Sequence, residues 1–133
     1  MISVKNSSRI FIAAFLLFGA VSLNAQSSDV TDSIADERNS MSKQIIRLRD
    51  TISIKIISLN NELTSVAPIN KPTVEKATRD LKFYQAQLEK GLDEIINTKV
   101  WQADIRSRST RLLSDMREKF KITGKELEKI GYQ

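Results

Sequence analysis

The stretch Val66-Ala67-Pro68-Ile69-Asn70-Lys71-Pro72 decides the fold of this chain. A proline has no backbone N–H to donate and its ring clashes with the preceding helical turn, so two prolines this close together end a helix. Apolar residues recur with helical spacing on both sides of the stretch. The sequence therefore predicts a turn at residues 66–72, at the tip of a long antiparallel helical hairpin of coiled-coil type.

Before this turn, apolar residues recur at steps of three, four or seven, which places them on one stripe of a helix. The stripe comprises Val30, Ile34, Met41, Ile45, Leu48, Ile52, Ile56, Leu59, Leu63 and Val66. Arg38 takes a position in this stripe that an apolar residue would be expected to fill. The pattern predicts one long first helix, sparsely apolar before Met41 and densely apolar after it.

After the turn, a second helix is expected to begin at Pro72 or Thr73. Its apolar stripe consists of Val74, Ala77, Leu81, Tyr84, Leu88, Leu92 and Ile95. Beyond Asn97 the apolar face moves to Trp101, Ile105, Leu112 and Met116, a rotation of roughly 100° at helical geometry. The second helix is therefore broken or rotated near residue 97, and residues 99–121 either continue it or fold back. In the hairpin, residues equidistant from Ile69 are expected to face each other.

The C-terminal end contains residues that typically mark the start and the end of a helix. Thr123-Gly-Lys-Glu126 matches a capping box, which satisfies free N–H groups at a helix start. Gly131 is placed to end a helix, because glycine readily adopts the left-handed conformation found there. We expect a short C-terminal helix from about residue 124 to 130.

Three isoleucines of the first helix, Ile46, Ile54 and Ile57, lie well off its main stripe, and we call them the isoleucine face. A two-helix hairpin would leave them in water. Either the segment that begins at Trp101 folds back onto them, or another chain covers them, or they are scattered surface residues. These three residues and Trp101 are the candidate interface, and the sequence slightly favours self-association.

The first 25 residues resemble a secretory signal peptide. Lys5 and Arg9 give a positive start, an apolar run of residues 10–21 follows, and Leu23-Asn24-Ala25 offers a cleavage site. The apolar run is shorter than the roughly 20 residues that span a bilayer. We expect residues 1–25 to be removed, which leaves residues 26–133 as a single helical domain that is exported, periplasmic or secreted.

The composition argues against catalysis and against cofactors. The chain has no cysteine and no histidine, which removes thiolate nucleophiles, imidazole bases and the usual zinc or haem ligands. No glycine-rich phosphate loop and no GxSxG turn is present. The chain contains pairs of acidic residues close together in sequence, and such pairs are typical of solvated helix faces and of first helical turns. We predict a protein that is not an enzyme and that needs no metal.

Positive charge is concentrated at the C-terminal end, where residues 99–133 carry nine Lys/Arg against five acids. On a helix through residues 99–121, one face carries cations and no acid: Lys99, Arg106, Arg117 and Lys121. This basic face could simply aid solubility, or it could contact an anion or partner such as lipid headgroups, envelope polysaccharide or an acidic protein. Nucleic acid is disfavoured, because export would separate the two and no aromatic residues interleave the charges.

These observations predict an exported, non-enzymatic, all-α interaction protein that acts by protein–protein contact or by self-association into a homo-oligomer. The alternative is a periplasmic, chaperone-like binding module that holds anionic envelope components or unfolded clients on its basic helix. In outline the chain resembles the small basic periplasmic chaperones, which are exported and built on helical hairpins, although it has no counterpart of their strand-bearing body.

Overall fold

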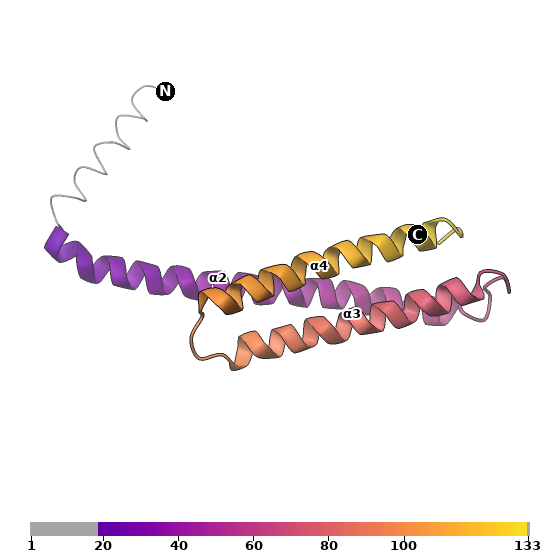
Figure 1. Cartoon of the computed structure of the whole chain (residues 1–133), viewed down its shortest axis with the longest axis horizontal. Coiled ribbons are helices and arrows are strands. Elements are labelled where there is room, and N and C mark those ends of the chain that lie inside the picture. The colour runs from indigo at the N-terminus through magenta and orange to yellow at the C-terminus, as the bar shows by residue number, and fades with distance from the viewer. Residues whose placement is uncertain (1–18, 133) are drawn as a thin grey trace, which may run out of the picture. The chain divides into compact units, whose positions relative to one another are not determined.

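A computed structural model describes residues 19–132, with side chains from Val30 onward. Its elements are α2 (Gly19–Glu62), α3 (Lys71–Asn97) and α4 (Ala103–Glu128), and the described residues contain no strand (Figure 1). The all-α hairpin with a break after residue 97 is therefore confirmed. None of the helices in this described part is long and apolar enough to cross a membrane.

The chain divides into two units, residues 1–36 and residues 37–133. In the first unit the structure describes only the beginning of α2, where Val30 and Ile34 are exposed. Most of the predicted signal peptide, residues 1–18, lies outside the described residues. The bundle discussed below belongs entirely to the second unit.

The hairpin turn is where the two prolines predict it. α2 ends at Glu62 and α3 begins at Lys71, with Asn70 as the N-cap and a proline in the first helical turn. Ser53 and Gln85, which are equidistant from Ile69, are joined by a hydrogen bond of 2.6 Å from Gln85 Nε2 to Ser53 Oγ. The predicted register of the hairpin is therefore confirmed.

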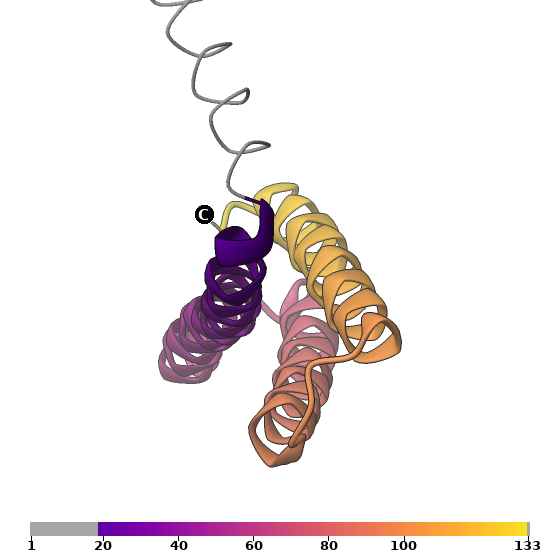
Figure 2. The same ribbon diagram turned by 90° about the vertical axis from the view of Figure 1, so that its left-hand side faces the viewer.

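The third helix packs on the hairpin to close one core. In the end-on view of Figure 2, α3, α4 and the part of α2 from Glu37 onward occupy the corners of a triangle. The buried side chains that meet there are Met41, Ile45, Ile52, Ile56, Leu59, Val74, Ala77, Leu81, Leu88, Leu92, Ile95, Trp101, Ile105, Leu113, Met116 and Leu127. Of the two alternatives for residues 99–121, the fold-back is the one observed.

Helix α4 runs without interruption through Thr123. The residues expected to form a short C-terminal helix are helical, but they are the last turns of α4, because Thr123 is buried inside the bundle instead of capping a new helix. Gly131 ends the helix with a φ of 93°, and the Tyr132 N–H donates to the Leu127 carbonyl over 3.0 Å. This pattern is a Schellman motif.

Candidate functional site

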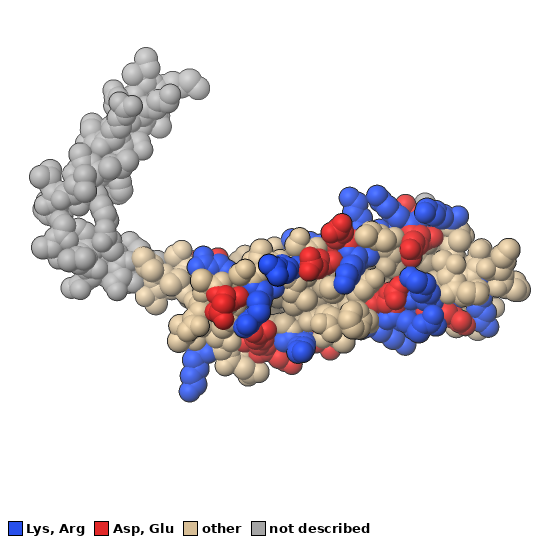
Figure 3. Space-filling model, viewed as in Figure 1, with Lys and Arg blue, Asp and Glu red and all other residues tan. Residues whose placement is uncertain are grey.

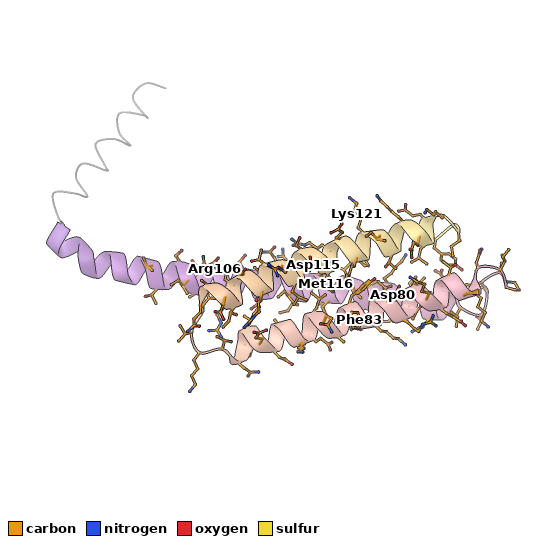
Figure 4. The ribbon with its side chains drawn as sticks, in the orientation of Figure 1. Asp80, Phe83, Arg106, Asp115, Met116 and Lys121 are labelled. Atoms are coloured by element: carbon orange, nitrogen blue, oxygen red, sulfur yellow. The ribbon has the colours of Figure 1, made fainter. Side chains whose placement is uncertain are left out.

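The basic face lies beside α2. Arg106 Nη1 is 3.6 Å from a carboxylate oxygen of Glu37, and Arg117 Nη2 donates to Gln44 Oε1 over 3.0 Å. Lys99 lies in the connection between α3 and α4, and Lys121 is exposed on α4 (Figure 4). The structure thus turns two of the four predicted cations toward partners within the same chain.

The isoleucine face divides into a covered and an exposed part. Ile46 packs against the core and Trp101 is only 7% exposed. In contrast, Ile54 and Ile57 are 69% and 59% exposed on neighbouring turns of α2. The fold-back of α4 therefore buries Trp101 without covering this pair of isoleucines.

Arg38 anchors the end of α3. Its Nη2 donates to the carbonyl oxygens of Ile95 and Thr98, each over 2.6 Å, and to that of Ile96 over 3.2 Å. The last carbonyls of a helix have no partner within the helix, and they lie at the negative end of its dipole. A guanidinium from α2 satisfies both requirements, which explains why a cation occupies a position in the apolar stripe.

Glu37 anchors the beginning of α4 next to it. Its Oε2 accepts a hydrogen bond of 3.2 Å from the indole Nε1 of Trp101, while its other oxygen faces Arg106. Indole N–H groups of buried tryptophans normally need such an acceptor. Glu37 and Arg38 together hold both sides of the α3–α4 connection, and we call them the Glu37–Arg38 clamp.

The remaining charges form small mixed networks on the surface. Figure 3 shows blue and red side chains interleaved over the face made by α3 and α4. Lys76 Nζ lies 2.8 Å from Asp80 and 3.8 Å from Glu126, and the hydrogen bond and charge of Asp80, followed by the charge of Glu126, raise the pKa of Lys76. Arg108 pairs with Glu94 between α3 and α4. These contacts are typical of solvated helix faces.

The described residues contain no cluster of metal ligands. No cluster of three or more acidic residues within them could hold a metal ion. Two of the acids, Glu37 and Glu94, are partners of Trp101, Arg106 and Arg108.

Comparisons with protein families, with curated proteins and with solved structures found no match for this chain.

Two sets of residues were missed by reasoning from the sequence. The Glu37–Arg38 clamp was indicated in the sequence only by the arginine in the apolar stripe. The Ile95 carbonyl to which Arg38 donates lies 57 residues further along the chain. A pocket between the three helices includes Lys55, Gly124 and Lys125 in addition to the predicted Lys121. Neither the spacing of these residues nor the composition indicated that they would meet.

Proposed function

We propose that this protein is an exported, non-enzymatic helical interaction protein that acts by protein–protein contact or self-association. The observation that carries the proposal is the exposed pair Ile54 and Ile57 on α2. β-branched residues are not favoured at exposed helix positions, and the pair lies on one face next to a core that is already closed. A partner that covers both side chains would remove their apolar surface from water.

The size of this surface favours a transient contact over a tight dimer. A stable interface buries about 800 Å² on each partner, and two isoleucines supply only a fraction of that area. The contact would therefore be small, or it would extend over neighbouring polar residues. Export, with the mature chain beginning near Gln26, is part of the proposal, and an intact mass that retains residues 1–25 would contradict it.

The test replaces both isoleucines with glutamine, which is a good helix former. We expect Ile54→Gln with Ile57→Gln to keep the helical content and melting temperature of the wild type. If the contact is self-association, the wild type should sediment in a concentration-dependent manner and the variant should not. If the contact is with another protein, crosslinking of envelope fractions should capture that protein with the wild type and not with the variant. Ile122→Gln is the matched control, because Ile122 is an exposed isoleucine on α4. Equal behaviour of all three proteins in both assays would contradict the proposal.

The second candidate is a binding module for anionic envelope components. It is supported by the surplus of cations in residues 99–133 and by the exposure of Lys99 and Lys121. Because Arg106 and Arg117 contact α2, the available charge is smaller than the sequence suggests. Binding of the monomer to phosphatidylglycerol vesicles that weakens as salt is added would support this candidate.

A further inference from the structure

A pocket of about 450 Å³ lies where all three helices meet near the C-terminal end of α4. Its apolar lining comes from Phe120 of α4, which is half-buried, with the fully buried Leu81 of α3 and Leu127 of α4 beneath it. The remaining lining residues are Lys55, Lys121, Thr123, Gly124, Lys125 and Glu128. This volume falls within the range of about 300–1,000 Å³ that is typical of small-molecule sites.

Gly124 lies in the wall of this pocket. A Cβ atom built at Gly124 would meet no heavy atom within 4 Å, so the space beside the helix is empty at this position. The backbone of Gly124 is ordinary α-helix, and no turn requires a glycine there. Glycine is an unfavourable residue within a helix. Its presence in the wall of the pocket therefore coincides with the space that a ligand would need.

The charge around the pocket is positive. Among the described residues that line it are three lysines, Lys55, Lys121 and Lys125, and one acid, Glu128. Within the described part of the chain, Lys121 and Lys125 are exposed and form no ion pair with a carboxylate. Glu126, the other acid on this turn, lies toward Lys76 of α3. An apolar floor with cations at its edge complements a ligand that has an apolar chain and an anionic head.

We propose that this pocket binds a single-chain anionic amphiphile of the fatty-acid class. The acyl chain lies along the half-buried Phe120, above the buried Leu81 and Leu127, while the ammonium groups of Lys121 and Lys125 bind the head group. The hydroxyl of Thr123 also belongs to the described lining and adds a hydrogen-bond donor. This site does not depend on the protein contact proposed for Ile54 and Ile57, which belong to the exposed part of α2.

The experiment measures binding of dodecanoate to the full chain by isothermal titration calorimetry below its critical micelle concentration. We expect saturable binding of one dodecanoate per chain. Dodecanol has the same chain without the charge and acetate has the charge without the chain, so both should bind at least roughly tenfold more weakly.

Two variants test the location. Gly124→Leu should fill the pocket and abolish binding, and it should leave the fold intact because leucine is a good helix former and the space is open. The double variant Lys121→Glu, Lys125→Glu should weaken binding at least roughly tenfold. Lys119→Glu makes one such substitution at an exposed position of α4 outside the pocket, and it should bind like the wild type.

Three results would overturn the proposal. The first is binding that Gly124→Leu leaves unchanged, which would place the ligand elsewhere on the chain. The second is equal binding of dodecanol and dodecanoate, which would remove the role of the lysines. The third is binding to phosphatidylglycerol vesicles without binding to dodecanoate, which would identify a membrane surface as the ligand. The circular dichroism spectrum of each variant shows whether it has folded.

Discussion

Replacing Arg38 with methionine separates two explanations for a cation in the apolar stripe of α2. If Arg38 is only a mismatch in the stripe, methionine should bury apolar surface and stabilise the protein. If Arg38 anchors α3, the substitution removes the donor that serves the carbonyls of Ile95, Ile96 and Thr98. The two explanations predict changes of opposite sign in the free energy of unfolding.

The magnitude follows from the contacts. Hydrogen bonds to a charged group contribute about 1.5–3 kcal/mol, and a cation at a helix C-terminus contributes about 0.3–1 kcal/mol. Arg38 is half-buried, so water can reach part of the site in the variant and offset some of the loss. We therefore expect Arg38→Met to lower the free energy of unfolding by about 2 kcal/mol, or the melting temperature by roughly 8 °C.

Urea unfolding followed by far-UV circular dichroism measures this change, with Trp101 emission as a local probe of the α3–α4 connection. Arg49→Met is the matched control on the same helix, because Arg49 pairs only with its neighbour Asp50 at the surface. Its effect should stay within about 0.5 kcal/mol. An Arg38→Met protein as stable as the wild type, or more stable, would refute the anchoring role.

Three further substitutions test the packing and the surface charge. Leu59→Ala should cost about 2–5 kcal/mol in urea unfolding, because Leu59 is 1% exposed in the core, and a loss below about 0.5 kcal/mol would contradict its burial. A Cβ at Gly91 would overlap with Cδ2 of Leu112, which is the end of a half-buried side chain that can rotate away. Gly91→Ala should therefore change the stability of the wild type by less than about 0.5 kcal/mol, because the helix gain and the cost of moving Leu112 offset each other, and it should stabilise a Leu112→Ala protein by about 1 kcal/mol; a double-mutant cycle without coupling would exclude this close approach. Because Asp80 raises the pKa of Lys76 above its usual 10.5, this pair stabilises the fold below that pH and the effect is lost as the pH rises through the raised pKa. Lys76→Met should cost a few tenths of a kcal/mol, roughly, at pH 7 and nothing in strongly alkaline buffer, and an equal deficit at both pH values would contradict the pairing.

The outcome for the isoleucine face shows the limit of periodicity. Helical spacing places Ile46, Ile54 and Ile57 together on one side of α2, and the same spacing predicts that the segment after Trp101 has its own apolar face. The structure covers Ile46 and Trp101 but leaves Ile54 and Ile57 exposed. Periodicity gives the direction of a side chain around its own helix. The position of the neighbouring helix determines whether that direction leads into a core or into water.

Whereas the fold-back and the full length of α4 came from the structure, the sequence by itself determined the first two helices, the turn at residues 66–72, the register of the hairpin and the break after residue 97. These features depend on local chemistry, since a proline without an N–H, a change of apolar face and the spacing of a stripe act over one or two helical turns. Tertiary structure alone decided that Arg38 would reach the end of α3, and that Lys55, Lys121 and Gly124 would meet around one pocket. Those contacts join residues that are far apart in the chain. They exist only because the three helices pack at one distance and one rotation, which the buried side chains of all three fix together.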